Sequence, residues 1–203
     1  MYNPAAFEET RPEELAAIMR EASLPVLISP ARDGGLLATH LPLLFQAPDR
    51  LIGHVARANL HWRDFDPARE SLAVFTAAQG YVSPSWYPAK QVHGRVVPTW
   101  NYSAVHATGR LRATDDPEET LAIVTALTAR HEAGRARPWH VSDAPEDYIA
   151  AQLKGLVGLV LTVTKLEGKA KLSQNRSLED RRGVIEGTAE ENPALSTAMK
   201  RGL

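Results

Sequence analysis

Strand-like and helix-like segments do not alternate along this 203-residue chain, and that order restricts the fold more than any other feature. Helical spacing of apolar residues occurs near the start, in the later part and near the end, whereas short apolar or β-branched runs fill the stretches between. The expected strands are 26–29, 36–45, 51–55, 72–76, 102–114 and 156–166, and the expected helices are 11–22 and those that begin after Asp116, Asp143 and Asn192. This order predicts an α+β chain built on an antiparallel barrel, rather than a doubly wound parallel sheet.

Local signals refine these expectations at three places. Thr10 followed by Glu13 has the pattern of a capping box, which predicts that the Thr10 side chain caps the first helix. Pro42, inside the second apolar run, predicts an edge position or a bulge. Segment 81–100 combines three prolines with four aromatic residues, so we expect an irregular segment that packs against the rest of the protein.

Composition excludes several classes of function. The chain has no cysteine, which excludes disulfides, Cys-ligated zinc, iron–sulfur centres and thiol catalysis. Its 23 Lys and Arg against 24 Asp and Glu give a net charge of −1, so there is no general electrostatic attraction to nucleic acid. Residues 1–9 lack the features of a signal peptide, and the longest apolar run, 156–163, is too short to span a bilayer. We therefore expect a cytoplasmic protein that does not contact a membrane.

Common catalytic and nucleotide-binding motifs are missing. The sequence contains no G-x-G-x-x-G, G-x-S-x-G or H-E-x-x-H motif. His40, His54 and His106 lie on expected strands that can bring them together, but their spacing favours hydrogen-bonded barrel histidines over metal ligands. We predict no metal site.

Four segments instead share a different character, in which aromatic, cationic and amide side chains stand close together. They are Gly53-His54-Val55-Ala56-Arg57-Ala58-Asn59, Tyr81-Val82-Ser83-Pro84-Ser85-Trp86-Tyr87-Pro88-Ala89-Lys90, Val97-Pro98-Thr99-Trp100-Asn101-Tyr102 and Glu167-Gly168-Lys169-Ala170-Lys171-Leu172-Ser173-Gln174-Asn175-Arg176. In this order they resemble the PaiB family of FMN-binding negative transcriptional regulators. The resemblance covers residues 1–187, and the four segments together are highly specific.

The resemblance implies a fold, an assembly and a cofactor. The implied fold is an antiparallel split β-barrel of the pyridoxamine-phosphate-oxidase type, over residues 1–187, followed by a helical tail over residues 188–203. The implied assembly is a homodimer that binds FMN non-covalently in a groove between its subunits. These expectations come from the family and not from periodicity or spacing.

FMN requires cations or backbone donors for its phosphate, a flat wall for its ring and hydrogen-bond partners for the ring edge. Arg57 and Lys90 are the first choices for the phosphate, followed by Arg176, and an ordinary surface cation is the alternative for each. In an extended segment 99–102, Thr99 and Asn101 share a face, which we expect to reach the ligand while Trp100 and Tyr102 pack. The complete set of predicted cofactor-binding residues is Thr39, His40, Arg57, Asn59, Lys90, Thr99, Trp100, Asn101, Gln174, Asn175 and Arg176.

Ordinary structural roles are the alternative to cofactor binding for several members of this set. Gln174 and Asn175 follow the last strand and can cap the next helix, and Thr39 and His40 can make ordinary barrel hydrogen bonds. Trp100 can pack in the core or in a dimer interface.

The resemblance is compatible with two principal functions. A transcriptional regulator would contact DNA, and the best candidate for a basic patch is 165–182, although acidic residues interrupt it. A flavin-dependent oxidoreductase would act on a small molecule, with His54 or His106 as the candidate acid or base. A third reading is that another planar anionic ligand occupies the pocket. Whether the chain is an enzyme therefore stays open at the level of sequence.

Overall fold

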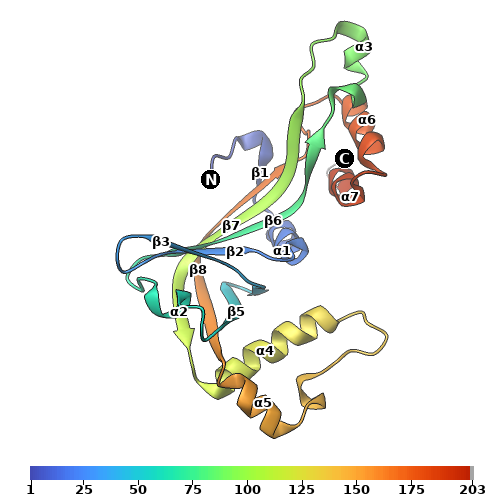
Figure 1. Ribbon diagram of the computed structural model, residues 1–203. Coiled ribbons are helices and arrows are strands. Elements are labelled where there is room, and N and C mark those ends of the chain that lie inside the picture. The colour runs from blue at the N-terminus through green and yellow to red at the C-terminus, as the bar shows by residue number, and fades with distance from the viewer. Residues whose placement is uncertain (202–203) are drawn as a thin grey trace. The chain divides into compact units, whose positions relative to one another are not determined.

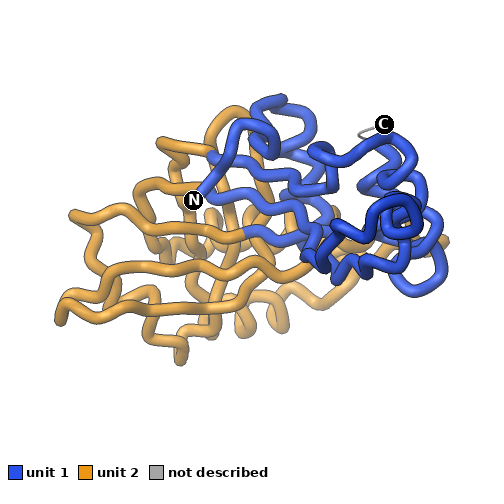
Figure 2. Tube along the Cα trace, turned by 90° about the horizontal axis from the view of Figure 1, so that it is seen from above, with its two compact units in different colours: residues 1–22, 75–106, 167–203 blue, residues 23–74, 107–166 orange. Residues whose placement is uncertain are grey.

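The computed structural model describes residues 1–201, which form two compact units (Figure 2). Unit 1 contains residues 1–22, 75–106 and the chain from residue 167 onward, and unit 2 contains residues 23–74 and 107–166. Each unit is described by itself.

An eight-stranded sheet runs through both units (Figure 1). Its strands are β1 (Glu8–Glu9), β2 (Val26–Pro30), β3 (Leu36–His40), β4 (Leu44–Gln46), β5 (Arg50–Ala56), β6 (Ser71–Val82), β7 (Thr99–Thr114) and β8 (Leu156–Lys171). The order is β3-β2-β6-β7-β8-β5-β4, with β1 paired to β8. The pairs β1–β8, β2–β3, β2–β6, β4–β5 and β5–β8 are all antiparallel.

Most predicted strands are present, but their bounds differ from the prediction. The expected strand 36–45 is two strands, because β3 ends at His40 and β4 begins at Leu44, so Pro42 lies in the connection and not at a bulge. β6, β7 and β8 are longer than expected, and each is shared between the two units. Between β6 and β7 the aromatic and proline-rich segment forms η2 (Pro84–Trp86) and α3 (Ala89–His93).

Unit 2 contains the helices α2 (His61–Asp64), α4 (Pro117–Glu132), η3 (Val141–Asp143) and α5 (Glu146–Leu153). Of these, α2 and α4 contact its strands, while η3 and α5 contact α4. Asp116 caps α4, because its Oδ2 accepts a hydrogen bond from the Glu119 N–H at 3.1 Å. Ile123 and Leu127 of α4 pack with Ile52 of β5 and Val160 of β8 in one buried cluster. This cluster fixes α4 on the sheet of unit 2.

Helices of unit 1 come from both ends of the chain and from the segment after β6. They are η1 (Ala5–Phe7), α1 (Pro12–Glu21), η2, α3, α6 (Leu178–Thr188) and α7 (Pro193–Arg201). The predicted capping box at Thr10 is wrong, because Arg11 is the N-cap residue of α1 and no side chain caps that end. The sequence reading predicted α7 but not α6.

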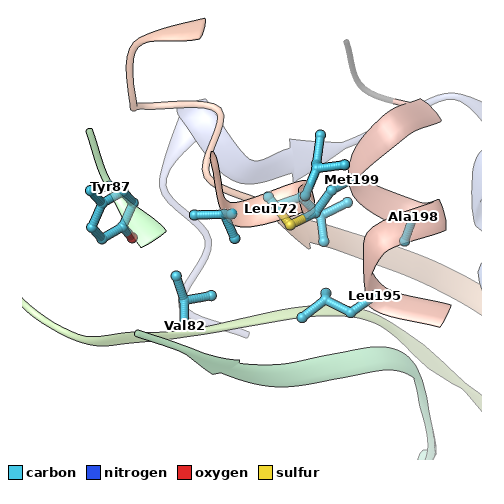
Figure 3. Close-up of a cluster of buried hydrophobic side chains, with 8 residues drawn as sticks. Val82, Tyr87, Leu172, Leu195, Ala198 and Met199 are labelled. Carbon is cyan, nitrogen blue, oxygen red and sulfur yellow. The ribbon is translucent and has the colours of Figure 1, made fainter. Parts of the chain in front are cut away.

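The core of unit 1 explains why α7 is ordered. Leu195 and Met199 of α7 are fully buried and join Val82, Tyr87 and Leu172 in a cluster that α6 completes (Figure 3). The division at residue 187 stays a prediction, but α7 packs inside unit 1. The predicted fraying of the tail falls partly on residues 202–203, which lie outside the described residues. Within residues 1–201, each helix falls short of the length and hydropathy that crossing a bilayer requires.

Candidate functional site

The predicted cofactor-binding residues are divided between the two units. Thr39, His40, Arg57 and Asn59 belong to unit 2, whereas Lys90, Thr99, Trp100, Asn101, Gln174, Asn175 and Arg176 belong to unit 1. Each unit brings some of its members together.

In unit 2, Thr39 and Asn59 belong to a chain of polar side chains that His61 organises. His61 begins α2 and is 3% exposed. Its Nδ1 lies 2.8 Å from Thr39 Oγ1, and its Nε2 lies 2.8 Å from Ser29 Oγ, which in turn lies 2.7 Å from Ser71 Oγ. Asn59 Oδ1 accepts from the His61 backbone N–H at 3.0 Å, while Asn59 Nδ2 donates to Thr39 Oγ1 at 3.4 Å. Thr39 and Asn59 are therefore close, and His61 is the residue that the sequence reading missed.

The electrostatic state of this chain follows from burial. Burial lowers the pKa of His61, so its imidazole is neutral at neutral pH, with one donor and one acceptor nitrogen. The Asn59 amide already donates to Thr39 Oγ1, so a Thr39 hydroxyl that donates to His61 Nδ1 satisfies both groups. Thr39 is half-buried and His40 is exposed. The oxygen of Thr39 thus has a fixed orientation at the edge of a buried polar network.

Arg57 is held by the backbone. Its Nε donates to the Lys154 carbonyl at 2.8 Å and its Nη2 to the Leu156 carbonyl at 3.2 Å, while the guanidinium lies 5.8 Å from the centre of the Trp62 ring. The Asp115 carboxylate is 3.9 Å from Nη1. A guanidinium has five N–H donors, so these contacts leave only part of the group for an anion.

In unit 1, three cations gather around the end of β8. Lys171 Nζ donates to Thr99 Oγ1 at 2.6 Å and to the Trp100 carbonyl at 2.7 Å. Burial lowers the pKa of Lys171, and the positive charges of Lys169 and Arg176 contribute in the same direction. Cations this close together create a local positive potential, which an anion relieves. We call Lys169, Lys171 and Arg176 the cation cluster.

Aromatic rings support the other two cations of this cluster. Lys169 Nζ lies 5.3 Å from the centre of the Tyr2 ring and 5.3 Å from that of Tyr102, and it donates to the Tyr2 carbonyl at 2.9 Å. The Arg176 guanidinium lies 5.0 Å from the centre of the Tyr87 ring. Burial raises the pKa of Tyr87 and Arg176 opposes that shift, so the ring stays neutral beneath the cation. From sequence, Arg176 is predicted to bind the FMN phosphate, whereas Lys169 and Lys171 are predicted only as members of a possible DNA-binding patch.

The expectation that Thr99 and Asn101 reach the ligand while Trp100 and Tyr102 pack stays a prediction, although Asn101 and Trp100 are buried the other way round within the chain. Asn101 is fully buried, whereas Trp100 is 50% exposed. Asn101 Nδ2 donates to Ser173 Oγ at 2.8 Å, and Asn101 Oδ1 is buried without a hydrogen-bond partner among the described residues. The reversal arises because Asn101 supports the turn that follows β8, where Ser173 has a positive φ of 67°.

The remaining predicted residues of unit 1 have modest contacts. Gln174 Oε1 accepts from the Leu172 N–H at 2.7 Å and its Nε2 donates to the Ala170 carbonyl, so it holds the same turn. Lys90 on α3 is exposed and donates to Ser85 Oγ at 3.1 Å. Asn175 is exposed in the turn. The assignment of these residues to a cofactor stays a prediction.

The three histidines that were considered as metal ligands have separate surroundings. Burial lowers the pKa of both His54 and His106, and His40 is exposed. Over residues 1–201, no three or more His, Cys, Asp or Glu side chains gather in a way that could hold a metal ion.

The residues present fit the two polar demands of a phosphorylated flavin. The cation cluster of unit 1 offers charge and N–H donors for a phosphate. The Thr39–Asn59–His61 network of unit 2 offers a fixed hydroxyl and amide of the kind that bind ring carbonyl and imide groups. These observations stand within each unit.

Comparison with known proteins agrees with this chemistry. The family described as "Putative FMN-binding domain" matches residues 1–165. Protease synthase and sporulation protein PAI 2 of Bacillus subtilis is 34% identical over 197 residues, which cover 95% of this chain and 92% of that protein. An uncharacterized protein of Aspergillus fumigatus is 32% identical, with 92% of this chain and 90% of that protein covered.

Solved structures with the same architecture have much lower identity. The FAD and heme binding protein of Mycobacterium smegmatis has a TM-score of 0.60 at 16% identity, with 86% of this chain and 78% of that chain covered. A flavocytochrome of Azotobacter vinelandii has a TM-score of 0.60 at 14% identity, with 87% and 75% covered. At this identity the likeness concerns the fold alone, and it confirms the predicted α+β antiparallel split β-barrel with peripheral helices.

Proposed function

Because this chain belongs to the PaiB family of FMN-binding domains, we propose that it is a flavoprotein that holds FMN non-covalently and uses it for redox chemistry on a small molecule. FMN is the cofactor that the family assigns, and when bound it supplies one- and two-electron transfer. The observation that carries the proposal is the cation cluster of unit 1, in which Lys171 has depressed basicity and a fixed geometry.

Lys171 and Arg176 are the residues that would hold the phosphate. Lys171 has three N–H donors, and two of them bind Thr99 Oγ1 and the Trp100 carbonyl, which holds the ammonium in place and leaves one donor for an anion. Arg176 is half-buried on the Tyr87 ring and presents a planar fork that matches a phosphate. Thr39, Asn59 and Arg57 of unit 2 stay predictions as further contacts to the cofactor.

A comparison of FMN with riboflavin tests the phosphate assignment, since the two differ only in that group. The purified full chain should bind FMN at least tenfold more tightly than riboflavin. Loss of a hydrogen bond to a charged group costs roughly 1.5–3 kcal/mol, so Lys171→Met and Arg176→Gln should each weaken FMN binding roughly 10- to 100-fold and leave riboflavin binding unchanged. Lys200→Met, an exposed lysine of α7, is the matched control.

Lys90→Met in the same titration tests the original sequence prediction for that residue. If the wild-type chain binds FMN and riboflavin equally, or if Lys171→Met and Arg176→Gln both behave like the control, the phosphate is not held by the cation cluster. If only Lys90→Met loses selectivity, the phosphate site lies at α3.

Anaerobic reduction tests the redox part of the proposal. The FMN-loaded protein is mixed with NADH or with NADPH, and the visible absorbance of the flavin is followed. Bleaching faster than that of free FMN supports an oxidoreductase. A flavin that stays oxidised with both reductants counts against the redox role without affecting the FMN-binding proposal.

Direct binding of DNA has less support. In the predicted basic patch, the side chains of Lys169 and Arg181 are only 6% and 8% exposed. The helix pair α6–α7 contains acidic residues in the first turn of α6 and in the intervening turn at 190–191. The two buried cations and the interspersed carboxylates therefore make this segment a weaker candidate for the extended basic face that neutralises DNA phosphates.

A gel shift with promoter fragments over a series of salt concentrations tests the regulator role. We expect no sequence-specific retardation with either the apo or the FMN-loaded chain. Specific retardation that survives at physiological salt would assign direct repression to this chain and would overturn the preference stated above.

We also propose the homodimer that the resemblance implies. Support comes from unit 1, where Val92, Val97 and Trp100 are 81%, 62% and 50% exposed within one short stretch. Exposed apolar side chains close together are typical of interaction surfaces. Light scattering after gel filtration should give twice the mass of the 22.2 kDa chain, and a monomer with bound FMN would refute the dimer.

A further inference from the structure

Two adjoining hollows lie beside α4 in unit 2, and their lining includes none of the residues assigned above to FMN. One has a volume of about 360 Å³ and is lined by α4, the loop 139–144 and α5, and the other has a volume of about 310 Å³ and is lined by α4, Pro42 and His54. Trp139 and Thr128 line both hollows, so the two share a wall. Volumes of this size suit a small organic molecule.

The backbone of Trp139 is held in place by a hydrogen bond, and its indole is partly exposed to solvent. The Trp139 backbone N–H donates to Glu132 Oε2 at 3.1 Å, and Glu132 Oε1 pairs with Arg135 Nε at 3.1 Å. The loop is thereby tied to the C-terminal end of α4, yet Trp139 is 47% exposed. An exposed indole on an anchored stretch of backbone offers a face for a planar ring.

His54 supplies a directional polar group to the second hollow. Its Nδ1 is buried and has no hydrogen-bond partner among residues 1–201, and burial lowers its pKa, so the ring is neutral at neutral pH. Enclosed N–H groups without an acceptor are rarer than enclosed lone pairs. The proton therefore belongs on Nε2, which is left as an N–H donor for a ligand.

The remaining lining agrees with a ligand that is largely apolar. Leu127 is buried in the α4 cluster, and together with Pro42 and Val124 it forms the aliphatic wall of the second hollow. The aliphatic wall of the first hollow is formed by Leu121, Val141 and Ile149. Polar side chains also line the hollows, among them Thr128 in both and Glu132 in the second. The aromatic and aliphatic surface suits a flat ring, the His54 donor suits a carbonyl acceptor on it, and the Glu132 carboxylate disfavours phosphates.

We propose that these hollows form a second binding site, which takes planar aromatic carbonyl compounds of the quinone class. The ring lies against the Trp139 indole and the aliphatic wall of α4, and a carbonyl oxygen accepts from His54 Nε2. The site uses residues of unit 2 only and does not depend on the binding of FMN.

Menadione is the probe, and the absence of cysteine from the chain removes the usual thiol adducts of quinones. The four tryptophans give four indole N–H signals in a nitrogen-correlated NMR spectrum of the full chain, and Trp139→Phe assigns the signal of Trp139. Addition of menadione should shift the Trp139 signal in a saturable manner and leave those of Trp62, Trp86 and Trp100 in place.

Variants separate the two contacts. Trp139→Ala should weaken menadione binding at least tenfold, whereas Tyr148→Ala, an equally exposed aromatic residue of α5 that lines neither hollow, should not change it. His54→Leu should weaken menadione binding about tenfold but leave the binding of 2-methylnaphthalene, which has no carbonyl, unchanged. His54→Gln, which keeps an N–H donor, should restore part of the loss.

Three results would overturn the proposal. One is a Trp139 signal that does not respond to menadione, or a response shared equally by all four tryptophans. Another is unchanged binding in Trp139→Ala, whose dispersed spectrum shows that it is folded. The third is a Trp139 signal that depends on protein concentration, with Trp139→Ala reducing the mass of the particle, since a second copy of the chain would then cover this face.

Discussion

Truncation of Leu195 to alanine should destabilise unit 1 strongly, although the residue lies in the last tenth of the sequence. Leu195 is 0% exposed and packs with Val82 and Met199 in the buried cluster (Figure 3). A Cβ placed on Gly80 of β6 would meet Leu195 Cδ2 at 3.0 Å, so the leucine lies directly on the strand backbone. A strand backbone cannot move into the space that the lost methyl groups leave.

The expected magnitude follows from this geometry. Removal of a buried leucine side chain costs about 2–5 kcal/mol, and the rigid surroundings place Leu195→Ala at roughly 3–4 kcal/mol. For a chain of this length each kcal/mol lowers Tm by about 2–4 °C, so the variant should melt roughly 6–16 °C below the wild type. Urea unfolding followed by both circular dichroism and tryptophan fluorescence measures the change, and coincident curves would justify a two-state treatment.

Leu178→Ala is the matched control, because Leu178 begins α6 and is 57% exposed. It should alter the free energy of unfolding by no more than about 0.5 kcal/mol. A Leu195→Ala variant within 1 kcal/mol of the wild type would show that α7 is not docked in the core of unit 1.

Three further outcomes are expected. Burial lowers the pKa of His61 from an ordinary value of 6.5, so the unfolded chain takes up this proton at a higher pH than the folded chain. The free energy of unfolding should therefore fall as pH decreases below about 6.5. Tm measured from pH 7.5 to 5.5 should fall less in His61→Gln than in the wild type, and an equal slope would contradict the assignment. The Arg112 guanidinium holds the pKa of Glu119 at about 2, yet both side chains are partly exposed, so Glu119→Gln should cost no more than about 1 kcal/mol at pH 7. This difference should be lost progressively as pH falls from about 4.5 to about 2. Chemical denaturation checks this, and a larger loss would refute a surface role. Gly109→Ala should destabilise unit 2, since its Cβ would collide with the Thr162 backbone of the neighbouring strand; a melting curve identical to that of the wild type would show that β7 and β8 can separate there.

Local patterns in the sequence determined the type and position of most elements. Asp116 and Pro117 fixed the start of α4, and the Asp33-Gly34-Gly35 turn fixed the β2–β3 hairpin, because a positive φ and an Asx hydrogen bond are properties of a few neighbouring residues. The order of strands and helices determined the fold class in the same way. The four family segments also identify the family of FMN-binding domains to which the chain belongs.

Tertiary packing decided which side chains are available to a ligand. Alternation along 99–102 predicts that Thr99 and Asn101 share a face of the strand, but it does not tell which face is buried. Asn101 is on the buried face, where its amide donates a hydrogen bond to Ser173 in the turn after β8. Likewise, nothing local marks His61 or Lys171, since each acquires its role from partners distant in sequence, Ser29 for one and Thr99 for the other. The chemistry of a site depends on such non-local contacts, which a pattern of nearest neighbours does not contain.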